Sequence, residues 1–115
     1  MKKELIYLAS PYSSSDSAVS DLRFRKVTRA AFFLIKDGYL VFSPIAHSHH
    51  ICKHGMCPDF DAWKEFDYKM IEVCDLFWVL KLDGYIDSVG VNAEIAYANQ
   101  LGKPVEFIDF KKEWE

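Results

Sequence analysis

The sequence predicts an α/β fold, a three-layer sandwich of flavodoxin or Rossmann-like type, and three observations lead to it. Apolar runs of strand length alternate with helical patterns in the order β-α-β-α-β-α-β. The first run, Leu5–Ala9, is continuously apolar, as in a parallel strand covered on both faces. The chain has 115 residues, the length of one domain, so we expect a single domain over residues 1–115. Together these observations predict a parallel sheet of four to five strands, in the order 2-1-3-4, with helices on both faces.

The first half of the chain predicts two strands joined by one long helix. After Leu5–Ala9, a loop rich in Ser covers residues 10–15, and the helix begins at about Asp16. Gly38 is the expected stop of this helix, and residues 39–42 form the second strand. The helix is recognised from apolar residues at helical spacing, namely Phe24, Val27, Ala31 and Leu34.

The second half begins with residues 45–59, whose histidines, cysteines, glycine and proline are typical of a loop. Helical spacing follows over residues 60–74, an apolar strand over 75–80, a third helix over 88–101 and a fourth strand over 104–108. In an open parallel sheet of this order, the ligand lies beyond the carboxyl ends of strands one and three. We therefore expect the site to be built from Ser10–Asp16 and Lys81–Glu94.

Composition and charge restrict the class of protein. Lys and Arg number 14 and Asp and Glu 17, and the net charge of −3 lacks the basic excess of a domain that binds polymeric DNA or RNA. No apolar stretch approaches the roughly 18 residues of a membrane span, and the apolar run near the N-terminus is too short for a signal peptide. We expect a cytoplasmic protein without a membrane partner, whose three cysteines, Cys52, Cys57 and Cys74, are reduced.

Two carboxylates break the polar and apolar patterns of their helices. At about 100° per residue, Asp67 falls inside the apolar stripe of the second helix and Glu94 inside that of the third. The stripes consist of Phe60, Trp63, Phe66, Met70 and Cys74 in the one helix and Val91, Ile95, Ala98 and Leu101 in the other. A buried carboxylate without a partner is costly. Each is therefore either hydrogen-bonded within the fold, to a backbone amide or to Tyr7, or faces a cleft where it acts.

The positions of the two carboxylates indicate different chemistry. Glu94 lies near the start of its helix, where amide dipoles favour the ionised form expected of a nucleophile. Burial would raise the pKa of Asp67, which suits a proton donor. Such a pair, about 5 Å apart, cleaves a glycosidic bond with retention. Ser88 begins the helix that carries Glu94. Together with Gly90, Ser88 either caps this helix or helps to hold an anion.

Three motifs give the chain a resemblance to a known family. They are IYLASPYS in the first strand and its loop, an aspartate pair eight residues apart (Asp67 and Asp75), and SVGVNAEIAYANQLGKPV near the end. On these motifs, which span nearly the whole chain, the protein resembles the nucleoside 2-deoxyribosyltransferase-like superfamily, and most closely a small family of unassigned function within it. The resemblance implies an enzyme that needs no metal or organic cofactor and forms a homo-oligomer, a dimer or tetramer.

The resemblance also implies roles for individual residues. Glu94 is expected to be the nucleophile that attacks C1′ of deoxyribose, Asp67 the general acid for the leaving base, and Tyr7 the residue that orients Glu94. Ser88 corresponds to a phosphate-binding serine in the branch that acts on nucleoside 5′-monophosphates. The glycine-rich first loop of these enzymes is replaced here by three residues that we expect to contact the substrate, Ser10, Pro11 and Tyr12.

The segment SPIAHSHHICKHG is a hallmark of the closer family and follows the second strand beside the expected cleft. His47 and His49 are expected to line the pocket for the base, with packing within the loop as the alternative. The spacing of the histidines and cysteines fits none of the standard zinc patterns, so we expect no metal. On the first helix, a basic cluster is expected to be a solvated face with salt bridges to Asp21 and its neighbours, or to supply one phosphate contact; it consists of Arg23, Arg25, Lys26 and Arg29.

Three functions are consistent with the sequence. The first is an N-glycosidase or deoxyribosyltransferase that acts on a (deoxy)nucleoside 5′-monophosphate or nucleoside through a covalent glycosyl-glutamate intermediate. The second is a non-catalytic nucleotide-binding module, and the third is an assembly subunit whose aromatic residues form interfaces. We favour the first because it accounts for both carboxylates on apolar faces.

Overall fold

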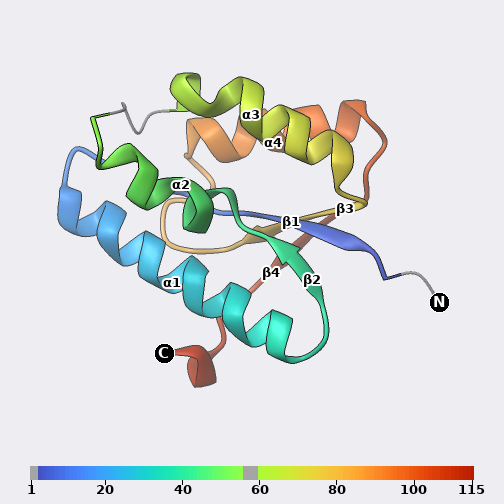
Figure 1. The fold of residues 1–115 in the computed structure, drawn as a ribbon, viewed down its shortest axis with the longest axis horizontal. Coiled ribbons are helices and arrows are strands. Elements are labelled where there is room, and N and C mark those ends of the chain that lie inside the picture. Colours follow the sequence, from blue (N-terminus) through green and yellow to red (C-terminus); the bar gives the residue numbers. More distant parts are fainter. Residues whose placement is uncertain (1–2, 56–59) are drawn as a thin grey trace.

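The computed structural model describes residues 3–55 and 60–115 and confirms the predicted α/β fold (Figure 1). In the described part of the chain the sheet has four strands, all parallel, in the predicted order β2-β1-β3-β4. The elements follow the chain as β1 (Leu5–Ala9), α1 (Ser17–Lys36), β2 (Leu40–Phe42), α2 (Pro44–Cys52), α3 (Phe60–Val73), β3 (Leu76–Leu80), α4 (Val89–Gln100), β4 (Val105–Ile108) and the short 3-10 helix η1 (Lys112–Trp114).

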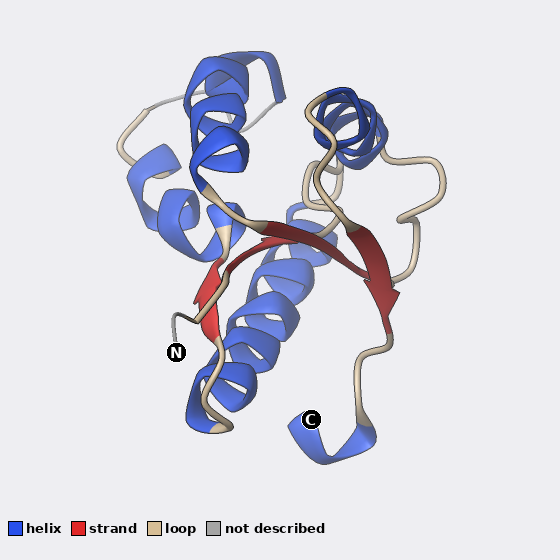
Figure 2. Cartoon of the chain, turned by 90° about the vertical axis from the view of Figure 1, so that its right-hand side faces the viewer, coloured by secondary structure: helices blue, strands red, loops and turns tan. Residues whose placement is uncertain are grey.

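Helices cover both faces of the sheet, as predicted (Figure 2). Successive side chains of a strand point to opposite faces, so Leu8 faces α1 whereas Tyr7 and Ala9 face α3 and α4. On the α1 side Leu8 packs in one core cluster with Val27. On the other side, Tyr7 packs with buried residues of β3, α3, α4 and the α3–β3 connection, namely Ile71, Cys74, Phe77, Val79, Val91 and Ala98. This alternation is what turns the Tyr7 side chain toward the two helices that carry the predicted carboxylates.

Both ends of α1 follow from local sequence. Asp16 is the N-cap, and its carboxylate accepts a hydrogen bond of 2.9 Å from the backbone N–H of Ala18. The helix ends at Lys36, and Gly38 adopts a φ of +102°, which favours glycine. The predicted start and stop of this helix are therefore confirmed.

The loop predicted over residues 45–59 is wrong in its first part, because α2 spans Pro44–Cys52. Ser43 caps this helix through a hydrogen bond from the backbone N–H of Ala46, and Pro44 occupies the first helical turn, where its missing N–H costs nothing. The helix buries Ser48, His49 and Cys52 against the rest of the fold. This packing outweighs a composition that is typical of a loop, and residues 56–59, including Cys57, lie outside the described part of the chain.

The buried face of α3 differs from the predicted stripe. Phe66 is 40% exposed, and the most buried positions of this helix are Asp67 and Ile71, followed by Cys74 just beyond its end. Asp67 therefore lies on the buried face, as predicted, whereas Phe66 does not. In α4 the predicted face holds Val91, Glu94 and Ala98, whereas Leu101 beyond the helix end is 39% exposed. Among the described residues, no helix is long and apolar enough to cross a membrane.

Candidate active site

A cleft of about 530 Å³ opens at the carboxyl ends of β1 and β3, where the strand order reverses. Small-molecule sites commonly enclose about 300–1,000 Å³. One part of its lining comes from the two segments that the sequence indicates, with Ser10, Tyr12 and Ser13 after β1 and Gly84, Asp87, Ser88, Val89, Gly90, Val91 and Glu94 after β3. The other part, from α1, α2 and α3, includes Arg23, Pro44, Ile45, Ser48, His49, Cys52, Asp61, Trp63 and Asp67.

Three elements bring Tyr7, Asp67 and Glu94 together; Asp67 and Glu94 line the cleft, and Tyr7 is fully buried behind them. The hydroxyl of Tyr7 in β1 donates a hydrogen bond of 3.0 Å to Oε2 of Glu94 in α4. The carboxyl groups of Asp67 in α3 and Glu94 are in hydrogen-bonding contact with each other. The Tyr7 ring is held by Phe77 of β3, on which it stacks with ring centroids 5.3 Å apart. A hydrogen bond to Tyr7 is what the structural alternative for Glu94 predicts. Asp67 and Glu94 also line the cleft, however, as the functional alternative predicts.

Burial raises the pKa of both carboxyl groups. The pKa of Asp67 rises to about 6 because the side chain is desolvated, although its hydrogen bond with Glu94 lowers that pKa. The pKa of Glu94 lies well above its ordinary value, first because of burial and then because of the nearby Asp67 charge, against the hydrogen bond from Tyr7. Two carboxylates in contact cannot both ionise without a large penalty. The pair therefore holds one proton near neutral pH.

The expectation that the helix dipole keeps Glu94 ionised is wrong. Ser88 is the N-cap of α4, which places Glu94 in the second turn, beyond the first turn where the dipole acts. Burial dominates at this depth and favours the neutral carboxyl. The hydrogen bond from the Tyr7 hydroxyl opposes this effect and favours negative charge on Glu94.

Two oxygen atoms of the cleft have hydrogen-bonding capacity that the protein does not use. Among the described residues, three buried side-chain atoms have no hydrogen-bond partner: Ser10 Oγ, Thr28 Oγ1 and Asp67 Oδ1. Ser10 and Asp67 line the cleft. An unpaired buried polar atom costs roughly 1–3 kcal/mol, so a ligand that pairs with these oxygens removes a penalty already present in the fold.

The start of α4 forms the polar side of the cleft. The Ser88 hydroxyl accepts a hydrogen bond of 3.2 Å from the backbone N–H of Val91, so Ser88 is a helix cap. Ser88 and Gly90 also line the cleft, as does Gly84 in the preceding loop. The capping interpretation of Ser88 is thus present in the structure, and it leaves the hydroxyl hydrogen available to a ligand.

The predicted binding residues divide into those that reach the cleft and those that do not. Ser10, Tyr12 and His49 line it, whereas Pro11 is fully buried and is not among its lining residues. His47 is also outside the lining, because residues two apart on a helix point in nearly opposite directions. Its ring stacks on Phe66 with centroids 5.1 Å apart. The expectation that both histidines line the pocket is therefore corrected to His49 alone.

Arg23 lines the cleft, whereas the sequence indicates it only as one of four basic side chains, with a phosphate contact as the alternative to a solvated face. Its guanidinium donates hydrogen bonds to the backbone carbonyls of Tyr12, Ser13 and Asp83, and so ties the loop after β1 to the loop after β3. The expected pairing of the basic cluster with Asp21 is wrong. Asp21 instead faces His49 and Lys53 of α2, because α2 packs against this side of α1.

Several other lining residues have no signal in the sequence. Pro44, Ile45, Cys52 and Trp63 give the cleft an apolar side. The indole N–H of Trp63 points at the Cys52 sulfur, 3.1 Å away, and so joins α3 to α2. Helical spacing assigns Trp63 to a core stripe, and only the position of α2 shows that it borders a cleft.

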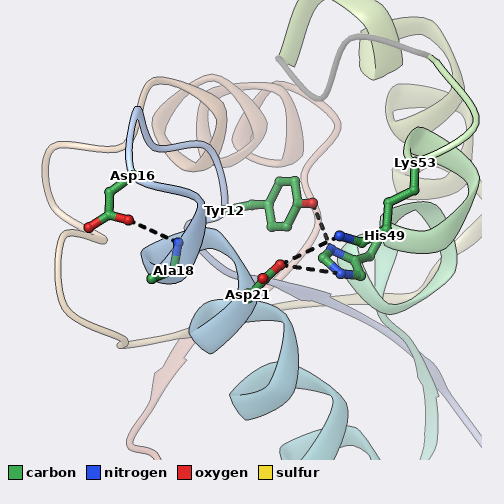
Figure 3. A network of polar contacts seen from close by, with 6 residues as sticks. All are labelled: Tyr12, Asp16, Ala18, Asp21, His49 and Lys53. Carbon is green, nitrogen blue, oxygen red and sulfur yellow. Dashed lines mark hydrogen bonds and ion pairs between the residues drawn. The ribbon is translucent and has the colours of Figure 1, made fainter.

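A second polar network joins the loop after β1 to α1 and α2, and two of its members, Tyr12 and His49, line the cleft (Figure 3). The Tyr12 hydroxyl lies 2.7 Å from His49 Nδ1, and His49 Nε2 lies 3.7 Å from the Asp21 carboxylate. Lys53 also faces Asp21, at 3.8 Å. Over residues 3–55 and 60–115, no three His, Cys, Asp or Glu side chains are grouped so that they could hold a metal ion.

Comparison with known proteins identifies a matching family and a similar solved structure. Residues 4–109 match the family model described as "Domain of unknown function (DUF1937)". A solved structure of a 2-deoxyribosyltransferase from the psychrotolerant bacterium Bacillus psychrosaccharolyticus is similar, with 26% sequence identity and a TM-score of 0.60 over 91% of this chain and 72% of that one. No curated protein matches the sequence. The predicted resemblance to the nucleoside 2-deoxyribosyltransferase-like superfamily is thus confirmed.

Proposed function

The chain belongs to the DUF1937 family, and from this premise we propose that its cleft breaks the N-glycosidic bond of a (deoxy)nucleoside or (deoxy)nucleoside 5′-monophosphate. The similar structure is that of a 2-deoxyribosyltransferase, which supports a nucleoside-related transferase activity. The observation that carries the proposal is the contact between two buried carboxyl groups, Asp67 and Glu94, with Tyr7 bonded to one of them. A pair that shares one proton offers a nucleophile and an acid at the same place.

In the first step, Glu94 acts as the nucleophile and Asp67 as the acid. An ionised oxygen of Glu94 forms a bond to C1′ of the sugar while the bond between C1′ and the base nitrogen breaks. The electron pair of that bond stays on the base nitrogen, which takes the proton of Asp67. The hydrogen bond from Tyr7 favours negative charge on Glu94 and so favours the reactive form of the pair, in which Asp67 holds the shared proton.

In the second step, an acceptor releases the sugar from Glu94. Water, or the nitrogen of a second base, attacks C1′ while the ester bond to Glu94 breaks, and the ionised Asp67 takes the proton that the acceptor loses. Glu94 and Asp67 then return to their starting states. Transfer and hydrolysis differ in the acceptor alone, so both fit the same three residues.

The polar side of the cleft supports binding of the sugar or its 5′-phosphate. Ser88 and Gly90 at the start of α4 offer a hydroxyl and backbone amides near the helix N-terminus, where a negative charge is favoured. Ser10 Oγ, which has no protein partner, is a further group for a sugar hydroxyl. The small-molecule partner in this proposal is therefore a nucleoside or a nucleotide.

Release of free base tests the proposal directly. The wild-type protein is incubated with 2′-deoxynucleosides and their 5′-monophosphates, with and without a second base as acceptor, and the products are separated by chromatography. We expect base release from at least one substrate and a loss of at least about a thousandfold in Glu94→Ala. Glu65→Ala, which removes an exposed carboxylate from α3, is the matched control and should retain full activity.

Two results would count against the proposal. Base release that persists at the wild-type rate in Glu94→Ala would exclude Glu94 as the nucleophile. Thermal stabilisation by nucleotides without any base release in the same samples would favour a non-catalytic nucleotide-binding module.

A further inference from the structure

We propose that the Tyr12 hydroxyl, fixed by His49, is a hydrogen-bond acceptor for the leaving base and makes the cleft select bases with an exocyclic amino group over their keto counterparts. Adenine and hypoxanthine form one such pair, and cytosine and uracil another. The proposal deepens the proposed function, on which it rests, by naming the substrate class. Tyr12 is the specificity-determining residue, and His49 is a positioning residue that acts through it.

His49 is held in one orientation by its neighbours. Its side chain is 5% exposed, and its ring stacks on Phe24 of α1 with centroids 3.8 Å apart and planes 12° apart. The rings of Tyr12 and His50 meet its edges at 5.7 and 5.3 Å. A ring enclosed on its face and its edges cannot turn over without repacking α1 against α2. The two ring nitrogens therefore keep the partners that the structure gives them.

The neighbours of the two nitrogens determine where the proton resides. Nε2 faces the carboxylate of Asp21 at 3.7 Å, and a negative charge on that side favours a proton on Nε2. Nδ1 then carries a lone pair and lies 2.7 Å from the Tyr12 hydroxyl, which is a short hydrogen bond. Since neutral imidazole has one donor and one acceptor, Tyr12 is the donor in this bond.

The charged groups around His49 leave the ring neutral. Asp21 of α1 faces it with one negative charge, whereas Lys53 and His50 of α2 oppose protonation, and Tyr12 contributes a neutral hydroxyl. Burial, the largest effect, and then Lys53 lower the pKa of His49 below its usual range, and Asp21 partly offsets them. A neutral His49 at neutral pH is the form that the hydrogen bond to Tyr12 requires.

The hydrogen bond to His49 uses the one hydrogen that Tyr12 can donate. A phenol has one donor and accepts through its oxygen, so the side that Tyr12 presents to the cleft is an acceptor. An amino group of a bound base can donate to this oxygen. A keto oxygen at the same position would face another acceptor, and both atoms would lose their hydrogen bonds.

The apolar side of the cleft argues that this part holds the base and not the sugar. Tyr12 and His49 lie on the α2 side, together with Ile45, Cys52 and Trp63. The capping serine and glycines lie on the α4 side. A flat heteroaromatic ring fits the first environment, and a sugar with hydroxyls or a phosphate fits the second.

Three variants separate the acceptor from the packing. Tyr12→Phe keeps the ring and removes the oxygen. His49→Phe keeps an aromatic ring beside Phe24 and removes Nδ1, so the Tyr12 hydroxyl can turn its hydrogen toward the cleft. His49→Asn places an amide oxygen near the position of Nδ1, which restores an acceptor for Tyr12. His54→Asn, at an exposed position of the same segment, is the control.

The readout is the ratio of affinities for matched bases, measured by titration calorimetry with adenine and hypoxanthine and with cytosine and uracil. In the wild-type protein we expect the amino base to bind about ten- to a hundredfold more tightly. The ratio should fall to within about twofold in Tyr12→Phe and His49→Phe, and should be retained in His49→Asn and His54→Asn. The ratio of kcat/KM for 2′-deoxyadenosine and 2′-deoxyinosine should follow the same order.

A second measurement determines which ring nitrogen of His49 carries the proton. In protein labelled with ¹⁵N-histidine, the chemical shifts of His49 should identify Nε2 as the protonated nitrogen at neutral pH. A proton on Nδ1, equal binding of the matched bases, binding of neither base at millimolar concentration, or an unchanged ratio in Tyr12→Phe would each overturn the proposal. Because base binding needs no turnover, a protein that prefers adenine but releases no base would refute the proposed function and leave this inference standing.

Discussion

Two tyrosine-centred networks border the same cleft, and they differ in what surrounds the hydroxyl. Tyr7 is fully buried and donates to Glu94, whose own neighbour is another carboxyl group, Asp67. Tyr12 is half-buried and is hydrogen-bonded to His49, beyond which lies the half-exposed carboxylate of Asp21. The first network confines a negative charge in a desolvated place, whereas the second fixes the direction of a hydrogen bond.

Under the two proposals, burial and not residue type separates the network that carries out the chemistry from the network that recognises the base. Desolvation raises the pKa of both carboxyl groups at the Tyr7 network, and shifted pKa values of this kind are typical of groups that transfer protons in a reaction. At the Tyr12 network, solvent screens Asp21 and Lys53, so their charges contribute little free energy. We therefore expect changes at the first network to alter turnover and stability, and changes at the second to alter specificity.

The largest difference between the two networks should appear in kcat, when Asp67 of the first and Asp21 of the second are each replaced by Asn. Asp67→Asn removes the proton donor, and we expect kcat to fall by about a hundred- to ten-thousandfold with bases that leave poorly. The loss should shrink with nucleosides whose base leaves without protonation, since no acid is then needed. Asp21→Asn should leave kcat within a few-fold of the wild type. An Asp67→Asn enzyme that is equally impaired with good and poor leaving groups would contradict the role of Asp67 as acid.

The pH dependence of stability should show the cost of the buried pair. The pKa of Asp67 is about 6 in the fold, against 3.8 for an ordinary aspartate, so the folded state binds the proton more tightly than the unfolded chain. This contribution is fully present below pH 3.8 and is lost as the pH rises through about 6, which amounts to about 3 kcal/mol.

Denaturation by urea at a series of pH values measures this effect. Between about pH 4 and 7, the free energy of unfolding of the wild type should fall relative to that of Asp67→Asn, which cannot titrate at this position. Parallel curves for the two proteins would mean that Asp67 has an ordinary pKa. Asp21→Asn, which changes an exposed carboxylate, supplies the comparison from the second network.

Substitution of Gly84, which lies next to Arg23, should have a smaller effect, on stability and KM instead of on kcat. Gly84 has a φ of +90°, and a Cβ placed there would lie 2.6 Å from Nη2 of Arg23. Gly84→Ala should cost about 1–3 kcal/mol and displace the guanidinium that holds the Tyr12 loop. We expect a lower Tm and a higher KM with kcat nearly unchanged. A fall in kcat without a change in KM would place this loop in the chemistry instead.

The smallest effect should come from the ion pair between Asp21 and Lys53. The two side chains are 46% and 59% exposed, and their charged atoms are 3.8 Å apart. Such pairs contribute about 0–1 kcal/mol, so Lys53→Met should change the free energy of unfolding by less than about 0.5 kcal/mol. A larger loss in thermal denaturation would show that the second network also stabilises the fold.

The sequence predicts the Tyr7 network better than the Tyr12 network, for a physical reason. Asp67 and Glu94 stand on apolar helical faces, so local periodicity indicates both, and the resemblance to the superfamily adds Tyr7. Phe66 shows the limit of this approach, because a helical stripe that is apolar in sequence still leaves one member 40% exposed.

The Tyr12 network depends on contacts between α1 and α2 that no local pattern encodes. Residues 45–59 have the composition of a loop, and only Ser43 followed by Pro44 signals a helix start there. Without α2, the partners of His49 could not be anticipated, and His47 and His49 could not be assigned to different sides. Asp21 and Arg23 carry no pattern that distinguishes a cleft residue from a solvated helix face.

Trapping the covalent intermediate tests the central claim most directly. A 2′-fluoro-substituted 2′-deoxynucleoside slows release of the sugar, because the fluorine destabilises the oxocarbenium-like transition state. After reaction and acid quenching, peptide mass spectrometry should find the sugar attached to Glu94, with one equivalent of base released, and no adduct in Glu94→Ala. Base release with unmodified protein, or an adduct on Asp67, would contradict the assignment of nucleophile and acid.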